Sequence, residues 1–211
     1  QGAEAVTGNS SDDRLPGRFS SPPCLACEVA PDYFDPLGVD PQQALDVARW
    51  RRATRRQLKN DRLKHTAEVR AEKAQALASH IDRLIFRKFA EISGQVVSGY
   101  WPIKAELDLR FWMDKMHQRG ARLALPVVEV PFEPLVFRAW TPDTRMECGH
   151  WNIPVPPPTS ETLNPNLALA PLVGWDASGY RLGYGGGYFD RTLAALSPRP
   201  FVIGVGLQSS K

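Results

Sequence analysis

The chain has 211 residues, a formal net charge of +3 and an apolar fraction of 43%, enough sequence to bury one hydrophobic core without disulfides or metals. No apolar run approaches the ~20 residues of a membrane-spanning helix, and the N-terminus lacks the basic-then-apolar pattern of a secretory signal. These features exclude a membrane protein and wholesale disorder, and we expect a cytoplasmic protein with no membrane partner.

Residues 1–41 predict an irregular N-terminal extension, because they are rich in Gly, Ser, Pro and Asp and show little apolar periodicity. Cys24-x-x-Cys27 has the spacing of a half zinc site or a redox motif, but no second pair follows it. With Cys148 the cysteine count is odd, which fits a reducing compartment better than a disulfide framework. We therefore assign the cysteines no metal or redox role.

The segment from about residue 42 to residue 90 predicts two helices, because nearly every residue in it favours helix and proline is absent. We place the break near His65-Thr66, with Thr66 as the N-cap of the second helix. In the second helix, apolar residues recur at helical spacing and predict a stripe that faces a core.

Basic residues greatly outnumber acidic ones between Arg49 and Lys73, so the first helix carries a positive patch. The patch has three interpretations: a solvated face, a phosphate contact or an RNA-binding surface. Trp50 is its only aromatic residue, and RNA-binding surfaces of the single-strand kind need stacking platforms. We therefore expect no nucleic-acid partner.

After residue 90 the apolar pattern alternates between strands and helices. Strands are predicted at 95–101, 122–126, 135–140, 167–175 and 201–206, and helices at 106–118 and 188–196. The first strand, helix and strand form a βαβ unit. This order predicts an α/β fold, a three-layer, mostly parallel sheet with helices on both faces, formed by residues 42–211 as a single domain. The proline-rich loop 141–165 is long enough to predict a functional role.

The segment from Arg181 to Arg191 contains four glycines in five positions, between a strand-like and a helix-like segment. Glycine permits positive φ and lets backbone N–H groups approach an anion, and the following helix adds a favourable dipole. Tyr184, between two of the glycines, and Tyr188, directly after the last one, offer faces on which a planar ligand can stack. The pattern indicates a phosphate site, with an ordinary tight turn as the alternative. The four histidines have no metal-site spacing and receive no catalytic role.

Three segments carry a resemblance to a known family. They are PLVGWDASGYRLGYGGGYFDRTLAAL (171–196), YWPIKAELDL (100–109) and WRRATRRQLKNDRL (50–63). Together they resemble the 5-formyltetrahydrofolate cyclo-ligases, also called methenyltetrahydrofolate synthetases. The resemblance implies ATP-dependent conversion of 5-formyltetrahydrofolate to 5,10-methenyltetrahydrofolate, with ADP and phosphate as the other products. It also implies Mg²⁺ as cofactor, small molecules as the binding partners and a monomer.

The resemblance also implies roles for residues at the matching positions. ATP would be bound by Arg51, Arg55, Arg181, Gly183, Tyr184, Gly185, Gly186, Gly187, Tyr188 and Phe189, with Arg52, Arg56 and Lys59 as alternatives to the first two. The folate would be bound by Trp101, Glu106, Tyr184, Gly185, Gly186, Gly187 and Tyr188. Asp190 would hold Mg²⁺, and Arg181 and Tyr188 would act in catalysis. For Glu106 a second interpretation is a helix N-terminal acid favoured by the dipole by about 0.3–1 kcal/mol.

The chain departs from the family pattern in two places. Arg51 stands where the family usually has lysine, and Thr54 stands where it has leucine. Family members also continue past the strand at 201–206 into a segment with a further metal-binding Asp, so we expect the domain to lack its C-terminal segment. These departures leave a diverged nucleotide- or folate-binding relative without turnover as the alternative function. Sugar-phosphate isomerases and coenzyme A transferases share this kind of architecture, and fold does not decide function.

Overall fold

The computed structural model describes residues 40–211. The extension predicted for residues 1–41 lies outside them except for Asp40 and Pro41, and so do Cys24 and Cys27. The helices are α1 (Pro41–Leu63), α2 (Ala67–Lys88), α3 (Arg110–Gln118) and α4 (Tyr188–Ala195), with 3-10 turns at His150–Asn152 and Gln208–Ser210. The strands are β1 (Val96–Ser98), β2 (Arg122–Val127), β3 (Val136–Ala139), β4 (Glu147–Cys148), β5 (Pro154–Val155), β6 (Leu167–Pro171), β7 (Gly174–Trp175), β8 (Arg181–Leu182) and β9 (Phe201–Val205).

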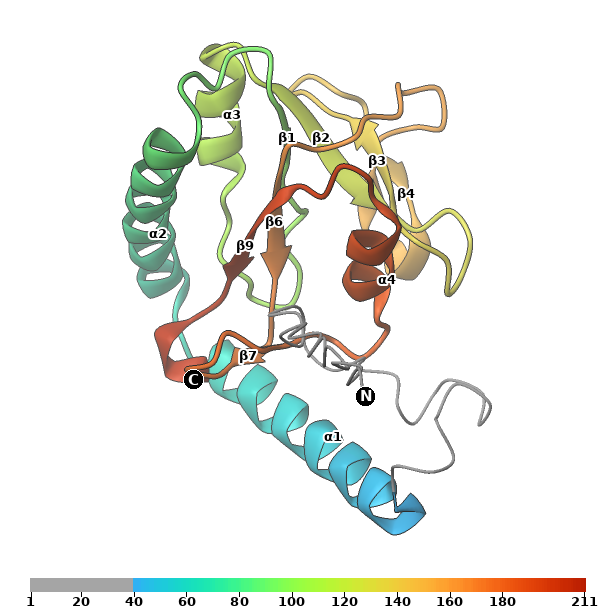
Figure 1. Ribbon diagram of the computed structural model, residues 1–211. Helices are drawn as coiled ribbons and strands as arrows, with labels where there is room; N and C mark the ends of the chain where they lie inside the picture. Colours follow the sequence, from blue (N-terminus) through green and yellow to red (C-terminus); the bar gives the residue numbers. More distant parts are fainter. Residues whose placement is uncertain (1–39) are drawn as a thin grey trace, which may run out of the picture.

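A five-stranded sheet in the order β3-β2-β1-β6-β9 organises the fold. Strands β2, β1, β6 and β9 are parallel, and β3 is an antiparallel edge strand. The α2 and α3 helices lie on one side of this sheet, whereas α4 lies on the other (Figure 1). The predicted α/β class, mostly parallel sheet and β1-α3-β2 unit are confirmed.

The two opening helices meet where the sequence predicts. Thr66 is the N-cap of α2, and its hydroxyl accepts a hydrogen bond from the backbone N–H of Val69 at 3.4 Å. Helix α1 points away from the sheet (Figure 1), and Asp40 caps its start. No helix among residues 40–211 is both long and apolar enough to cross a membrane.

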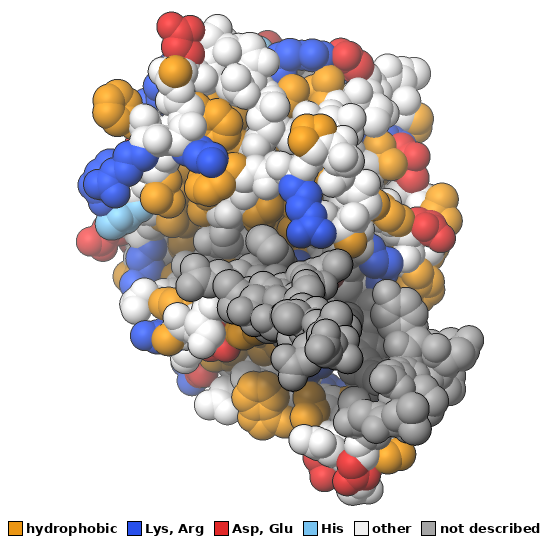
Figure 2. Space-filling model, viewed as in Figure 1, with side chains coloured by type: hydrophobic (Ala, Val, Ile, Leu, Met, Phe, Trp, Pro, Cys, Tyr) orange, Lys and Arg blue, Asp and Glu red, His pale blue; other side chains and the backbone are white. Residues whose placement is uncertain are grey.

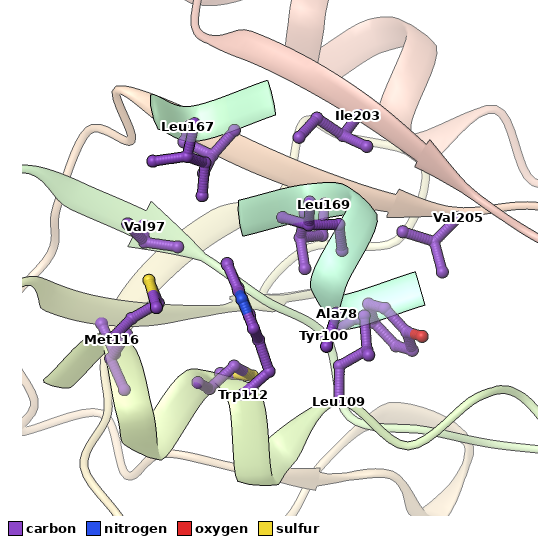
Figure 3. Packing of buried hydrophobic residues seen from close by; sticks show 14 of the residues in the cluster. Ala78, Val97, Tyr100, Leu109, Trp112, Met116, Leu167, Leu169, Ile203 and Val205 are labelled. Atoms are coloured by element: carbon purple, nitrogen blue, oxygen red, sulfur yellow. The ribbon is translucent and has the colours of Figure 1, made fainter. Parts of the chain in front are cut away.

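The main core lies between the sheet and the α2–α3 layer. Figure 3 shows Trp112 and Met116 of α3 packed toward Val97 of β1 and Leu169 of β6. Each of these four side chains is fully buried. A smaller cluster of Ala124, Phe137 and Leu163 forms separately. The alternation of large apolar side chains along the strands therefore determines which face receives α2 and α3.

Two predicted elements have different boundaries in the structure. The predicted strand 167–175 is divided into β6 and β7, because the chain leaves the main sheet after Pro171 and β7 pairs with β8 instead. The predicted helix 106–118 begins only at Arg110. Both differences lie next to the carboxyl ends of the central strands, where the candidate site forms.

On the visible described surface, Lys and Arg side chains are dispersed among apolar and neutral groups (Figure 2). Acidic side chains gather at the lower tip, where Figure 1 places the start of α1. The basic residues that matter for the site lie further along α1.

Candidate active site

The glycine-rich loop connects β8 to α4, as the sequence predicts. Gly185 has φ +108° and Gly187 has φ +62°, and a Cβ on Gly186 would lie 2.8 Å from the Tyr188 ring. Gly187 is the N-cap of α4, whose N-terminus has no side-chain cap. The loop therefore needs glycine for its shape, and it leads to helical N–H groups that can donate hydrogen bonds to an anion.

Helix α1 presents a cationic face to this loop. Arg52, Arg55 and Lys59 follow one another at helical spacing and line the same cavity. The Arg55 Nε donates a hydrogen bond to the carbonyl oxygen of Gly183 at 2.8 Å, and the Nη2 of Arg55 is buried without a hydrogen-bond partner among the described residues. Burial, followed by the neighbouring cations, lowers the pKa of Lys59. This concentration of positive charge suits a polyphosphate.

The cavity between α1 and the loop has a volume of about 520 Å³, within the range of small-molecule sites. It is lined by Arg52, Arg55, Lys59, Pro131, Phe132, His150, Trp151, Tyr184, Gly185, Gly186 and Tyr188. Arg51 is not among these residues, so the register alternative Arg52, not Arg51, accompanies Arg55 at the cavity.

Aromatic side chains line another part of the same cavity. The rings of Trp151 and Tyr188 meet edge to face at 5.5 Å, and the Tyr188 hydroxyl accepts a hydrogen bond from the backbone N–H of Phe132. Phe132 and Trp151 both have positive φ, +67° and +56°, which is rare for bulky residues and marks a locally strained backbone. The sequence identified loop 141–165 as functional but not His150 or Trp151 in particular, and nothing in it singled out Phe132.

A chain of hydrogen bonds joins α1, the glycine-rich loop and Glu106. The Arg62 Nη2 donates to the Tyr184 hydroxyl at 2.5 Å, and that hydroxyl donates to the Glu106 Oε1 at 2.5 Å. Glu106 follows β1, and Tyr184 follows β8 in the β7–β8 hairpin that the chain forms after β6. Because β1 and β6 are paired and parallel, both residues belong to the connections that leave the carboxyl ends of these two strands.

Glu106 lies in a loop rather than at the start of a helix, so its interpretation as a helix N-terminal acid is wrong. Lys104 and Ala105 both have positive φ, as in a type I′ turn, and the N–H of Glu106 donates to the carbonyl of Ile103 at 2.9 Å. In return, the Ile103 N–H donates to the Glu106 Oε2 at 2.9 Å. The turn thus directs the carboxylate back toward Tyr184.

Burial raises the pKa of Glu106, and the hydrogen bonds from Tyr184 and Ile103 oppose that rise. Only 8% of Glu106 is exposed. Burial and the adjacent Glu106 charge also raise the pKa of Tyr184. Tyr184 therefore remains a hydrogen-bond donor, and its partner is a carboxylate with a reduced preference for the charged form.

Several predicted site residues lie outside the cavity lining. Arg181 and Asp190 form an ion pair with each other, in which both side chains are mostly buried. The guanidinium of Arg181 lies over the Phe189 ring, at 5.7 Å from its centroid. Trp101 lies under the guanidinium of Arg110 at 4.6 Å and packs against the main core. The structure thus brings together Arg55, Glu106 and the loop from Gly183 to Tyr188. Four other predicted residues lie outside the cavity lining: Arg181, Phe189, Asp190 and Trp101.

The donor set for a metal ion is small. No group of three or more His, Cys, Asp or Glu side chains able to hold a metal occurs within residues 40–211. Mg²⁺ commonly takes one or two protein carboxylates together with substrate phosphates and water. Asp190 is a ligand of the correct type, but it must share its carboxylate with Arg181 or release it.

Comparison with known proteins decides the family. The family model for 5-formyltetrahydrofolate cyclo-ligases matches residues 47–207. The chain belongs to the 5-formyltetrahydrofolate cyclo-ligase family. The match extends from α1 to just beyond β9, so it includes the cationic face, Glu106 and the glycine-rich loop.

Relatives of the cyclo-ligase family cover most of this chain. It is 32% identical over 146 residues to a 5-formyltetrahydrofolate cyclo-ligase of Mycolicibacterium smegmatis, and this alignment covers 65% of this chain and 71% of the relative. It is 27% identical over 165 residues to one of Haemophilus influenzae, which spans 75% and 86%. The solution structure of the Aquifex aeolicus 5,10-methenyltetrahydrofolate synthetase matches with a TM-score of 0.62 at 27% identity, over 76% of this chain and 79% of that one. The fold is therefore that of this enzyme family.

Proposed function

We propose that the protein converts 5-formyltetrahydrofolate to 5,10-methenyltetrahydrofolate at the expense of ATP, with release of ADP and phosphate. The observation that carries the proposal is the junction of α1, the glycine-rich loop and Glu106. Here a cationic cavity and a buried carboxylate are linked through one tyrosine, Tyr184. Family membership supplies the reaction class.

The ATP phosphates would occupy the cavity between α1 and the loop. Arg52, Arg55 and Lys59 supply positive charge from α1, and Gly185 and Gly186 of the loop before α4 line the same cavity. The unpartnered Nη2 of Arg55 supports this placement, because a buried guanidinium N–H without a partner is costly unless a ligand accepts its hydrogen bond.

The folate ring would pair with Glu106. A carboxylate accepts two parallel N–H bonds from an aminopyrimidine edge, and in the structure its Oε1 already accepts from the Tyr184 hydroxyl. The cavity beside Glu106 has a volume of only about 10 Å³, so its lining must open before a ring can reach the carboxylate.

The proposed chemistry needs positioning rather than a side-chain nucleophile. The formyl oxygen attacks the γ-phosphorus of ATP, and ADP leaves. N10 then attacks the activated formyl carbon and loses its proton, and the C–O bond breaks to release phosphate. The chain's task is to hold the formyl oxygen in line with the γ-phosphate and to neutralise the growing charge. Tyr188 lines the cavity and would form one wall for the reacting groups.

Asp190 remains our proposal for the magnesium ligand, with Arg181 as its neighbour. A bound Mg²⁺ would neutralise charge on the phosphate oxygens. With Asp190 as a metal ligand, the guanidinium of Arg181, its ion-pair partner, would lie close enough to contact the same phosphates. The ion pair thus keeps both groups in place next to the α4 N-terminus.

The decisive experiment is a product assay. Purified full-length protein with 5-formyltetrahydrofolate, ATP and Mg²⁺ should form a methenyl product that absorbs in the near ultraviolet, together with stoichiometric ADP. Omission of ATP or of the folate should abolish the signal. The Tyr180→Phe variant is a control that should form product like the wild type, because Tyr180 is exposed and lies outside the cavity. Absence of product from a folded protein contradicts the proposal.

A diverged binder without turnover is the second candidate. It is favoured by one observation, the absence of Arg51 from the cavity lining. Thermal shifts with ATP and with the folate separately, combined with an inactive assay, would identify it, because a ligand that binds the folded state raises the melting temperature.

A further inference from the structure

Arg62 is a buried arginine with an unpartnered N–H group. It lies in the last turn of α1 and is only 6% exposed. Its Nη2 donates to Tyr184, whereas its Nε is buried and has no hydrogen-bond partner among residues 40–211. Most buried polar groups are paired, so an exception of this kind requires an explanation.

The surroundings of Arg62 resemble one end of a flat polar ligand site. Arg62 and Glu106 line the same small cavity, whose other walls include Tyr100, Leu107 and Leu172. A guanidinium and a carboxylate thus lie close together among apolar groups, with the Tyr184 hydroxyl hydrogen-bonded to both. The volume of about 10 Å³ admits roughly one water molecule, so the cavity must widen before a ring can reach the pair.

A pterin edge carries two donors, its 2-amino group and N3–H, followed by one acceptor, the oxygen at C4. A carboxylate pairs with the two donors, and the acceptor needs an N–H group directly beside them. We propose that the Nε of Arg62 donates to the C4 oxygen of the pterin while Glu106 accepts from N3–H and the 2-amino group. Arg62 is then a specificity-determining residue for the folate, and this inference rests on the proposed function.

The inference predicts discrimination between two ligands of the same shape. In the 2,4-diamino analogue of the substrate, an amino group replaces the C4 oxygen and N3 loses its hydrogen. A donor then lies against the Nε of Arg62, and Glu106 loses one of its two donors, so the part of the preference that Arg62 supplies is the part lost in its variants. A site built to hydrogen-bond a specific group rejects the analogue that lacks it, because its buried polar atom is left unpaired. The wild-type protein should therefore bind the 4-oxo ligand more tightly than the 4-amino ligand.

Calorimetric titrations in the absence of ATP test this on the full chain. Both ligands are titrated into the wild type and into the Arg62→Met, Arg62→Lys and Arg49→Met variants. Arg49 is a matched control from the same helix, with a side chain that is 75% exposed. We expect Arg62→Met to reduce the 4-oxo preference by about ten- to a hundredfold. We expect Arg62→Lys to reduce it as well, because lysine keeps the charge but lacks the planar Nε–H, and Arg49→Met to leave it unchanged.

Each result decides the question. If Arg62→Met weakens both ligands equally, Arg62 has a structural role only and the inference is overturned. If Arg62→Lys keeps the full preference, charge rather than the Nε donor is responsible, and the inference is again overturned. Should Arg62→Met fail to fold by circular dichroism, Arg62→Lys carries the test. A wild type that binds neither ligand and forms no product contradicts the proposed function, whereas an active enzyme without the 4-oxo preference contradicts the inference alone.

Discussion

At the scale of single residues, Tyr184 connects the two halves of the site. Its hydroxyl accepts from Arg62 on α1 and donates to Glu106 after β1, so three distant parts of the chain depend on one oxygen atom. A hydrogen bond to a charged group contributes roughly 1.5–3 kcal/mol. The oxygen therefore influences both the position and the charge of Glu106.

We predict that Tyr184→Phe raises the KM for 5-formyltetrahydrofolate by about tenfold or more, because Glu106 and Arg62 each lose a hydrogen bond and the carboxylate favours its neutral form. Steady-state kinetics at saturating ATP measure the change. Tyr180→Phe, which removes an exposed tyrosine hydroxyl, should match the wild type. An unchanged KM in Tyr184→Phe would show that the bridge does not serve the folate.

Glu106 gives a prediction about pH. Burial raises its pKa above the ordinary value of 4.5, so the folded state binds this proton more tightly than the unfolded state. The buried charge therefore reduces stability above the raised pKa, and the reduction disappears as the pH falls through that pKa toward 4.5. At neutral pH, the free energy of unfolding of Glu106→Gln should equal or exceed that of the wild type. As the pH falls, the stability of the wild type should rise relative to that of the variant.

The same variant should lose folate affinity by more than tenfold at neutral pH, because an amide cannot accept two N–H bonds from the ring edge. Urea unfolding at a series of pH values measures the stability, and a folate titration measures the affinity. A variant that is less stable at neutral pH and binds folate normally would contradict both statements.

At the scale of elements, the connection from β8 to α4 depends on its backbone conformation. We predict that Gly185→Ala destabilises the protein by about 1–3 kcal/mol and raises the KM for ATP several-fold. At φ +108° an alanine is strained, and its Cβ would lie 3.5 Å from the guanidinium carbon of Arg55. Urea unfolding and ATP kinetics provide the two measurements.

Gly179→Ala separates strain from function. Gly179 also has positive φ, +87°, but lies in an exposed turn where a Cβ meets nothing within 4 Å. The Gly179→Ala variant should be less stable than the wild type and should keep the wild-type KM for ATP. If both glycine variants raise this KM equally, the effect arises from the general loss of stability and not from the loop.

How much of these elements the sequence predicts depends on how local their causes are. The break at Thr66 and the glycine-rich loop before α4 are confirmed, because a cap residue and a glycine run act within a few positions. The predicted start of α3 was wrong, because Lys104 and Ala105 adopt positive φ. Lysine and alanine usually avoid this conformation, so nothing in the sequence indicates the turn that delays the helix. The division of β6 from β7 was missed because both lie in one apolar run.

The candidate site was predictable only in part, because contacts distant in sequence form much of it. The hydrogen bond from Arg62 to Tyr184 joins residues 122 positions apart, and no local pattern distinguishes Arg62 from its basic neighbours on α1. His150 and Trp151 reach the cavity through an irregular segment with positive φ. The roles of all the predicted site residues remain predictions, including those of Arg181, Asp190, Phe189 and Trp101.

At the scale of the whole molecule, α1 is a separate arm that contacts the rest of the domain through the site. Arg55 and Arg62 bind the glycine-rich loop, and Leu58 lies against Gly174 of β7. Ligands placed on either side of Tyr184 would order the same junction. The first ligand to bind would therefore already order part of the junction, and the second would lose less conformational entropy on binding.

We predict that a non-hydrolysable ATP analogue and 5-formyltetrahydrofolate stabilise the protein more together than the sum of their separate effects. Each ligand at a hundred times its Kd should contribute about 2.7 kcal/mol, which corresponds to roughly 5–10 °C in Tm for a chain of this size. Calorimetric titration of the folate with and without the analogue should show a several-fold gain in affinity, and the reciprocal titration should show the same factor. Equal folate affinities in both titrations would contradict the coupling, and with it the idea that the α1 arm and the glycine-rich loop act as one unit.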